Sequence, residues 1–267
     1  MPLRKHAYYL LSVGRLLSGI QNWPLVVRIF LKRPPPGPQL IRLRGSGVQF
    51  RVRGAMDVWI VKETYLDRFY ERFGTSIGDG WTVIDVGAGI GDFTLRAALG
   101  HPENRVYAFE PFPESFSLLQ ENLRLNRAPN VQAFAEAIGG ETGTLALDLS
   151  SGEPLQFSTE GKGAPEKALA VPCLSLADAF QRLSLARCDV LKLDCEGAEY
   201  DILFQAPDAV LDGIEHIVME YHDGVTRHSH QDLVEFLSAR GFQVRTQPSP
   251  VHAHLGFLYA KAGPRRP

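Results

Sequence analysis

The stretch "TVIDVGAGIGDFTLRAALG", from Thr82 to Gly100, carries the most informative pattern of the sequence. An apolar run of strand length leads into three glycines within five residues, Gly87, Gly89 and Gly91, and an amphipathic pattern follows them. A strand, a glycine turn and a helix in this order are typical of the first unit of a nucleotide-binding α/β domain. The turn therefore predicts a ligand that carries a nucleotide.

The rest of the chain repeats this alternation of short apolar strands and amphipathic helices. We expect strands at residues 82–86, 105–109, 131–137, 189–193, 214–220, 243–245 and 256–261, and helices at residues 92–99, 114–126, 175–183, 198–205 and 231–240. This order predicts an α/β fold with a doubly wound, seven-stranded, mostly parallel sheet that binds ligands above the carboxyl ends of its strands. Residues 139–172 break the pattern and predict short extra strands with a Gly-rich tip.

Residues 1–75 are predicted to form an appendage to a main domain at residues 76–267. The appendage would contain an amphipathic helix, a Pro-rich linker at residues 33–38, a hairpin and a second helix at residues 56–74. Two interpretations of the basic and apolar residues 1–33 compete. The helix docks on the core or on another subunit, which we favour, or it lies on an anionic membrane surface.

Composition narrows the class of partner. The net charge of the 267-residue chain is −2, and basic and acidic residues are dispersed through most of it, so a nucleic acid partner is not expected. The three cysteines lack CxxC spacing, which fits a reducing, cytoplasmic location. Contact with the membrane periphery is left open by residues 1–33 alone. The sequence does not set an oligomeric state.

The acidic residues near the glycine turn indicate which nucleotide-bearing ligand it holds. Asp92 stands where the third glycine of a GxGxxG dinucleotide turn would be, and Asp85 ends the first strand, so both disfavour a pyrophosphate such as that of NAD. They suit the amine and sulfonium of S-adenosylmethionine. Glu110, nineteen residues beyond Gly91, ends the next strand, where an acid can bind ribose hydroxyls.

Four stretches carry a resemblance to a known family: "VIDVGAGIGDFTLRAA", "RVYAFEPFPESFSLLQENLRLN", "EAIGGETG" and "DVLKLDCEGAEYDIL". They resemble the successive motifs of class I S-adenosylmethionine-dependent methyltransferases of the FkbM family, over roughly residues 48–260. The resemblance implies a seven-stranded sheet with an antiparallel last strand. It also implies methyl transfer to oxygen, typically a hydroxyl of a sugar, a glycolipid or a polyketide-type natural product.

The resemblance and the turns around it give a set of candidate donor-binding residues. They are Asp85, Gly87, Ala88, Gly89, Gly91, Asp92, Phe93, Glu110, Pro111, Phe112, Glu136, Ala137, Ile138 and Asp194.

Proton transfer from an alcohol acceptor needs a further group, and the candidates lie at the carboxyl ends of the fourth and fifth strands. We expect His222, Asp194 and Glu220 to be catalytic, with His222 as general base because an unperturbed imidazole titrates near neutrality. A structural interpretation competes for Asp194, since Lys192 lies two residues before it and an ion pair or a helix cap would use the same carboxylate. For Glu196 and Glu199, a helix-terminus role is at least as well supported as catalysis.

Histidine and carboxylate clusters also raise the question of a metal. Asp194, Glu220 and His222 could ligate a divalent cation, but their sequence spacing does not establish that they converge, and we predict no metal. The histidines within residues 227–232 are expected at the start of a helix that Ser229 caps. Those at residues 252 and 254 are expected in a solvated loop.

The predicted function is therefore an S-adenosylmethionine-dependent O-methyltransferase acting on a small-molecule or glycan hydroxyl. Methylation of RNA or protein is an alternative, which would need a basic acceptor face. A non-catalytic scaffold that binds S-adenosylmethionine is another.

Overall fold

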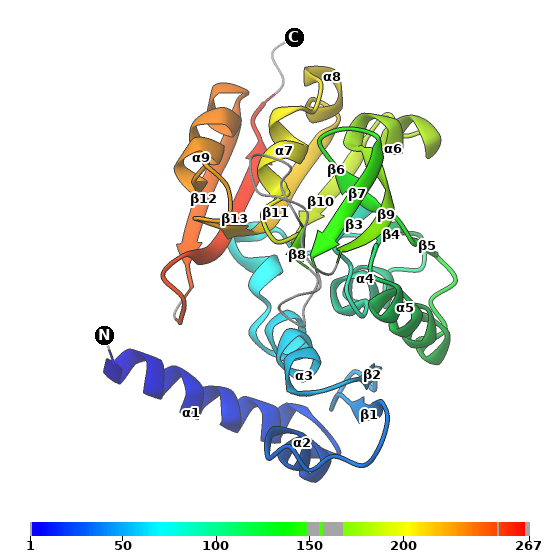
Figure 1. The fold of residues 1–267 in the computed structure, drawn as a ribbon, viewed down its shortest axis with the longest axis vertical. Helices are drawn as coiled ribbons and strands as arrows, with labels where there is room; N and C mark the ends of the chain where they lie inside the picture. The colour runs from blue at the N-terminus through cyan, green and yellow to red at the C-terminus, as the bar shows by residue number, and fades with distance from the viewer. Residues whose placement is uncertain (1, 149–154, 157–167, 250, 265–267) are drawn as a thin grey trace.

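The computed structural model describes residues 2–148, 155–156, 168–249 and 251–264, called the described residues below. A seven-stranded sheet forms its centre, in the order β12-β13-β11-β10-β3-β4-β5 (Figure 1). Only β13 runs antiparallel to its neighbours in this sheet, which confirms the predicted α/β fold class and the antiparallel last strand. The strands are β3 Thr82–Val86, β4 Arg105–Phe109, β5 Val131–Phe134, β10 Cys188–Leu193, β11 Ile214–His222, β12 Phe242–Pro248 and β13 Leu255–Ala262.

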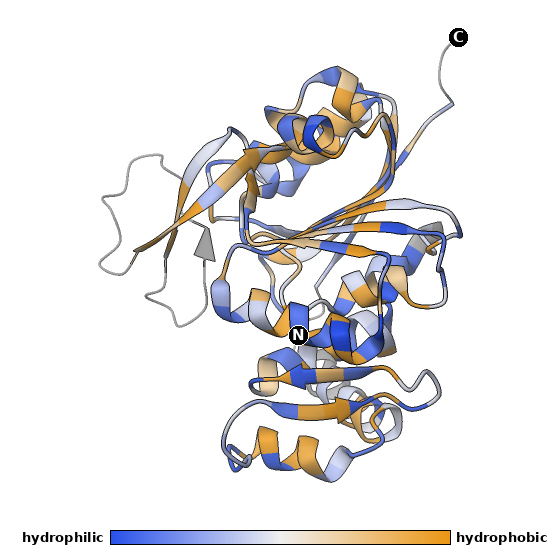
Figure 2. Ribbon diagram, turned by 90° about the vertical axis from the view of Figure 1, so that its right-hand side faces the viewer, coloured by the Kyte–Doolittle hydropathy of each residue, from blue (hydrophilic) through white to orange (hydrophobic). Residues whose placement is uncertain are grey.

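Helices cover both faces of this sheet, and alternate strand residues supply the two cores. Val83 packs with the face that holds α4 and α5, whereas its neighbour Ile84 packs with the face that holds α6, α7, α8 and α9. Figure 2 shows the sheet strands as largely hydrophobic between these helices. The helices are α4 Asp92–Ala98, α5 Pro113–Asn126, α6 Leu176–Arg182, α7 Glu199–Phe204, α8 Asp208–Leu211 and α9 His230–Ala239.

A smaller four-stranded sheet, in the order β6-β9-β7-β8, accounts for the break in the pattern at residues 139–172. Its strands are β6 Ala137–Gly139, β7 Gly143–Asp148, β8 Leu155–Gln156 and β9 Ala168–Ser175. The predicted extra strands are thus confirmed. Most of the predicted Gly-rich tip lies outside the described residues.

The amino-terminal segment packs beneath the main sheet, as Figure 1 shows. It consists of α1 Pro2–Gly19, α2 Trp23–Phe30, the hairpin of β1 Gln39–Arg42 and β2 Gln49–Val52, and α3 Ala55–Val61. The hairpin is confirmed. The single helix predicted at residues 56–74 is wrong, because α3 continues as a π-helical turn over Lys62–Asp67 and then, after Arg68 in a left-handed conformation, as a 3-10 segment over Phe69–Gly74.

Tertiary contacts explain that break. The Nζ atom of Lys62 is fully buried, 2.6 Å from Asp67 Oδ2 and 3.0 Å from Tyr8 Oη. These contacts tie α1 to the π-helical turn, and Leu16 and Ile20 of the α1 region are buried. Docking of α1 on the core is therefore confirmed for one of its faces. None of the helices within the described residues is long and apolar enough to cross a bilayer.

Candidate active site

The glycine turn lies between β3 and α4, directly against the end of β10. Gly87 has a φ of 69°, and a Cβ atom on it would lie 1.9 Å from the carbonyl oxygen of Asp194. No other residue fits there without moving the backbone. Gly89 also has positive φ but has nothing within 4 Å of its missing Cβ, so its side of the turn is open. The N–H groups of Gly87 and Ala88 both donate to Phe109 O, at 3.0 Å, which fixes the turn against β4.

Glu110 links the glycine turn to the next turn along the sheet. Its Oε2 accepts from Gly89 N at 2.7 Å, and its Oε1 accepts from Phe112 N at 2.9 Å. Burial raises the pKa of Glu110 to about 7, against the opposing effect of these two hydrogen bonds. The predicted position at the end of the second strand is correct. Both carboxylate oxygens hold backbone amides here, and the ribose contact stays a prediction.

Asp85 lies underneath the turn and is fully buried. Its Oδ2 accepts from Thr94 Oγ1 at 2.6 Å, and its Oδ1 lies 3.1 Å from Lys192 Nζ. Lys192 in turn donates to Gly87 O at 2.8 Å and lies 3.8 Å from Asp194 Oδ2. Of the two roles expected for Asp85, the structure shows the anchoring of the turn, while contact with a ligand ammonium stays a prediction. Because Lys192 compensates the charge of Asp85, Asp85 disfavours a pyrophosphate less than the sequence alone indicates.

Several other predicted donor-binding residues lie behind the turn. Asp92 is buried and hydrogen bonded to the Thr64 hydroxyl, and burial raises its pKa to about 6, partly offset by Lys192. Phe93 is buried against the ring of Tyr70, and Glu136 pairs with Arg182 of α6. Of the remaining candidates, Ala88, Ala137 and Ile138 are buried, while Pro111 and Phe112 are half-buried.

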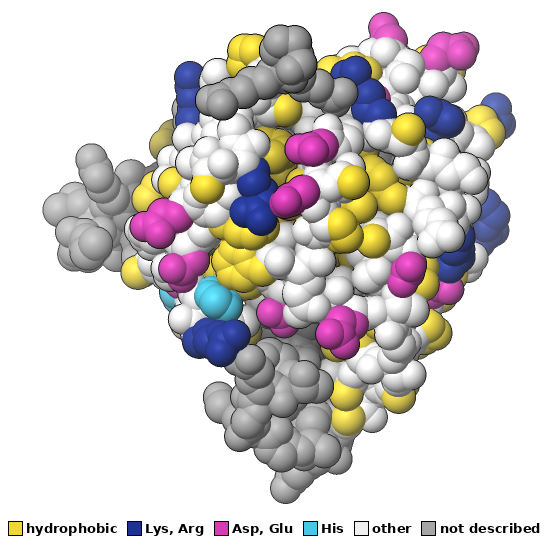
Figure 3. All heavy atoms as spheres, turned by 90° about the horizontal axis from the view of Figure 1, so that it is seen from above, with side chains coloured by type: hydrophobic (Ala, Val, Ile, Leu, Met, Phe, Trp, Pro, Cys, Tyr) yellow, Lys and Arg dark blue, Asp and Glu magenta, His cyan; other side chains and the backbone are white. Residues whose placement is uncertain are grey.

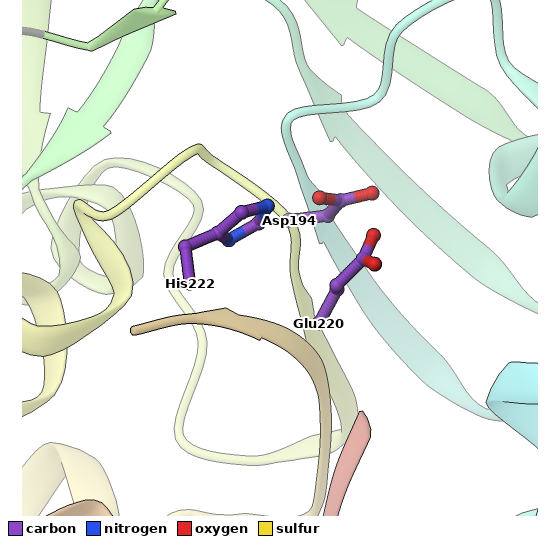
Figure 4. Close-up of side chains that lie close together, drawn as sticks. All are labelled: Asp194, Glu220 and His222. Carbon is purple, nitrogen blue, oxygen red and sulfur yellow. The ribbon is translucent and has the colours of Figure 1, made fainter. Parts of the chain in front are cut away.

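The three predicted catalytic residues converge. Asp194 follows β10, Glu220 and His222 lie two residues apart on β11, and one potential ligand atom from each lies within 4.8 Å of the others. Figure 4 shows the three side chains turned toward a common region. Tyr70 donates its hydroxyl to Asp194 Oδ2 at 2.9 Å, and the Lys192 contact confirms the predicted ion pair. Asp194 does not cap the following helix, so of its structural roles the ion pair is confirmed and the helix cap is wrong.

His222 does not have the ordinary imidazole environment on which its role as general base was argued. Its Nδ1 lies 3.0 Å from Glu199 Oε1, and its Nε2 lies 3.5 Å from Glu196 Oε2. Burial alone would lower the pKa of His222, but the carboxylates of Glu199, Glu196 and Asp194 raise it to about 10. The imidazole is thus protonated near neutrality and can orient or stabilise charge rather than accept a proton.

Glu220 has an environment that favours the protonated carboxyl group. Burial, followed by the neighbouring carboxylate of Asp194, raises the pKa of Glu220 well above its ordinary value. Glu63 lines the same cavity, accepts from Trp59 Nε1 at 2.9 Å, and has a pKa raised to about 7 by burial. Glu63 and Tyr70 were not predicted from the sequence. Both lie before the first strand of the main sheet, and no motif relates their positions to the residues at the strand ends.

Within the stretch "DCEGAE", Glu199 is fully buried and makes the contacts that hold the turn. Its carboxylate accepts from Cys195 N at 2.9 Å and from Gly197 N at 2.7 Å, in addition to its contact with His222. Burial would raise the pKa of Glu199, but His222 and these amides lower it overall. Glu199 therefore holds the turn after β10 and fixes the orientation of the imidazole.

A cavity of about 980 Å³ opens from this acid cluster toward the amino-terminal helices. Its polar end is lined by Asp194, Glu196, Glu220 and His222, and the rest is mainly apolar. His252 and His254 also line it, and both are exposed on the loop before β13, as expected for a solvated loop. The predicted cap is confirmed, since Ser229 and Asp232 form a capping box at α9. A volume near the top of the usual range of about 300–1,000 Å³ suits a sizeable ligand.

Asp194, Glu220 and His222 also form the cluster among the described residues that could hold a divalent cation. A metal would need a neutral imidazole and two ionised carboxylates. Here Glu199 favours the charged imidazole, and Lys192 already supplies a cation beside Asp194. The absence of a metal stays a prediction.

Comparison with known proteins points to a single family. A family model described as the methyltransferase FkbM domain matches residues 85–244. Methyltransferase 1 of Beauveria bassiana is 29% identical, covering 76% of this chain and 89% of its own length. The 31-O-demethyl-FK506 methyltransferase FkbM of Streptomyces tacrolimicus is 26% identical, covering 80% and 93%. The hexuronic acid methyltransferase AglP of Haloferax volcanii is 24% identical, covering 75% and 80%.

Proposed function

The chain belongs to the FkbM methyltransferase family, and we propose that it transfers a methyl group from S-adenosylmethionine to a hydroxyl oxygen. The acceptor class is a sugar, a glycolipid or a natural product. The relatives named as a 31-O-demethyl-FK506 methyltransferase and as a hexuronic acid methyltransferase support this class. The observation that carries the proposal is the convergence of Asp194, Glu220 and His222 beside the glycine turn and at the end of a large cavity.

The donor side of the proposal rests on the turn after β3. Gly89 leaves open space, and Glu110 ends the adjacent strand with its carboxylate at the turn. Bound S-adenosylmethionine would supply a methyl group already activated by its sulfonium. The residues of the turn position it, and alignment with the acceptor oxygen supplies much of the rate.

On the acceptor side, Glu220 takes the proton of the attacking hydroxyl as the oxygen–carbon bond forms and the carbon–sulfur bond breaks. The raised pKa of Glu220 makes it a stronger base than an ordinary carboxylate. His222, held by Glu199, and Asp194, held by Tyr70 and Lys192, orient the acceptor. We place the enzyme in the reducing cytoplasm, a proposal supported by its three buried free thiols.

Calorimetric titration with S-adenosylmethionine, S-adenosylhomocysteine and NAD tests the donor site. We expect the two adenosyl ligands to bind, NAD to fail, and Glu110→Gln to weaken binding at least about tenfold, since a carboxylate hydrogen bond contributes roughly 1.5–3 kcal/mol. The matched control is Glu103→Gln, an exposed site for which the same chemical change should have no effect. Binding of NAD alone would overturn the proposal.

Transfer of a radiolabelled methyl group to a panel of hydroxyl compounds tests the reaction itself. Donor binding without transfer to any panel member would favour the scaffold alternative. We expect transfer to survive dialysis against EDTA, because Lys192 and the charged imidazole already balance the carboxylates. Loss of activity on dialysis that Mg²⁺ or Mn²⁺ restores would instead assign a metal to the Asp194 cluster.

A further inference from the structure

Charge is divided unevenly along the chain. Residues 1–56 contain ten of the 28 Lys and Arg residues and none of the 30 Asp and Glu residues. The remainder therefore holds eighteen basic and thirty acidic residues, so the near-neutral total conceals two regions of opposite sign. The expectation of dispersed charge is wrong for this segment. Figure 3, which shows the end of the molecule away from α1 and α2, displays acidic and basic side chains interspersed.

The same segment exposes apolar side chains. Among the described residues, nine of the ten exposed large hydrophobic side chains belong to residues 9–56, including Leu10, Leu11 and Leu31, which are 75%, 66% and 63% exposed. Isolated exposed apolar residues are ordinary, but a group of them on adjoining helices marks a binding surface. Because Leu16 is buried against the core while Leu10 and Leu11 are exposed, docking of α1 leaves these two leucines free.

The cavity connects this surface with the acid cluster. Six of the nine exposed hydrophobic side chains in residues 9–56 line it, namely Tyr9, Val13, Val27, Phe30, Leu31 and Met56. Glu220 and His222 line its other end. A ligand that fills it would thus meet apolar side chains along its length and titratable groups at one end.

We propose that α1 and α2 dock on an anionic membrane surface, and that the cavity receives the apolar chain of a membrane amphiphile whose hydroxyl-bearing head group lies at Glu220. This inference rests on the proposed function for its chemistry and names the acceptor class more narrowly. Exposed cations such as Arg28 and Arg33 lie beside the apolar surface, the combination that binds anionic leaflets. A second copy of the chain is a poorer occupant, because pairing this face with itself would bring two cationic segments together.

Vesicle flotation of the full chain tests the docking step. We expect binding to vesicles of phosphatidylcholine with 30% phosphatidylglycerol and little binding to pure phosphatidylcholine. Arg28→Glu/Arg33→Glu should weaken partitioning about thirty-fold or more, because each cation near an anionic leaflet contributes about 1 kcal/mol. The matched control, Arg124→Glu/Lys261→Glu, changes charge equally at exposed sites outside residues 1–56 and should bind as the wild type does.

A second variant separates apolar insertion from charge. Leu10→Ser/Leu11→Ser alters two exposed side chains that do not line the cavity, and should also release the protein from vesicles. Equal flotation of the wild type and both helix variants would overturn the docking step. Concentration-dependent dimerisation that the leucine variant abolishes, without vesicle binding, would assign the surface to a second copy instead.

Entry of the chain into the cavity is measured at Trp59, which lines it. In a Trp23→Phe background, vesicles containing dibrominated-acyl phosphatidylglycerol should quench the fluorescence of Trp59, and the further change Trp59→Phe should remove that signal. Vesicle binding without quenching would reject the cavity half of the proposal. Calorimetry with S-adenosylmethionine should give wild-type affinity for every surface variant, so failure of docking is distinguishable from failure of the proposed function.

Discussion

At the scale of single residues, the site depends on carboxylates whose environments differ. Glu199 is buried with His222 and two amides, and its pKa is lowered, whereas Glu220 is buried beside another carboxylate and its pKa is raised. The two acids are therefore suited to different tasks, Glu199 to holding a charge and Glu220 to exchanging a proton.

Glu220→Gln should lower the rate of methyl transfer by about 100-fold or more, since general base catalysis contributes typically 10²–10⁴-fold. In the wild type, the rate should rise with pH as Glu220 loses its proton, and this rise should disappear in the variant. Donor affinity should be unchanged. The exposed Glu235→Gln serves as control, and an unaltered pH profile in Glu220→Gln would assign the proton to another group, with Glu63 the next candidate.

His222 should contribute stability that depends on pH. Its folded-state pKa of about 10 lies above the unfolded value near 6.5, so the contribution is fully present below about pH 6.5 and is lost as pH rises toward 10. The loss amounts to a few kcal/mol. Urea unfolding of the wild type and His222→Asn at pH 6 and pH 10 measures it, and we expect the variant to lose less stability over this interval. Equal losses would show that the imidazole is not held in its charged form.

The pairing of Glu199 with His222 is beyond prediction from the sequence. The residues are 23 positions apart, and their contact follows from the parallel register of β10 and β11 together with the turn between β10 and α7. The sequence did predict that Asp194, Glu220 and His222 lie at the carboxyl ends of neighbouring strands. It could not predict the imidazole pKa, because that depends on three carboxylates brought close by folding.

At the scale of elements, the apolar runs of the main sheet predict β3 and β4 to the residue, at 82–86 and 105–109. Both faces of these strands are buried, so the strands appear in the sequence as nearly continuous apolar runs whose limits can be read directly. The segment at residues 56–74 was predicted poorly because its local pattern is helical throughout. The buried contacts of Lys62 with Asp67 and of Phe69 O with the Tyr259 hydroxyl outweigh that preference.

The turn from β3 to α4 gives a test at this scale. Gly87→Ala should destabilise the fold by more than about 3 kcal/mol and abolish donor binding, because the added Cβ meets the backbone oxygen of Asp194. Gly100→Ala is the matched control, since Gly100 also has positive φ but has nothing within 4 Å, and should cost only about 1–2 kcal/mol. Thermal unfolding and calorimetry compare the two, and similar losses would mean that conformation, not the close approach, requires glycine.

At the scale of the whole molecule, the amino-terminal segment and the sheet share one core. Leu16, Ile20, Val26 and Ile29 are nearly fully buried and pack in the same cluster as Val83 and Val190 of the sheet. The uneven distribution of charge between residues 1–56 and the remainder is present in the sequence, although dispersed charge was expected. What the sequence could not provide is the cavity, because its walls come from segments as distant as Tyr9 and Phe257.

Deletion of residues 1–33 should therefore unfold the protein rather than leave an active domain. It removes four buried apolar side chains, each contributing roughly 1.5–3 kcal/mol, a loss comparable with the stability of a typical domain. We expect circular dichroism to show no cooperative thermal transition. Leu10→Ser/Leu11→Ser, which alters only exposed positions, should melt within a few degrees of the wild type, and a cooperative transition in the truncated chain would show that the sheet folds alone.

Lys192 lies between the donor-binding turn and the proposed catalytic residues, since its ammonium donates to the carbonyl of Gly87 and lies near the carboxylate of Asp194. A sulfonium donor brings a positive charge to this neighbourhood, and its thioether product leaves without one. The surrounding carboxyl groups would then give up protons when the donor arrives and recover them after turnover. Donor and product should differ in the number of protons exchanged on binding, and the enzyme would discriminate against its own product through charge rather than shape.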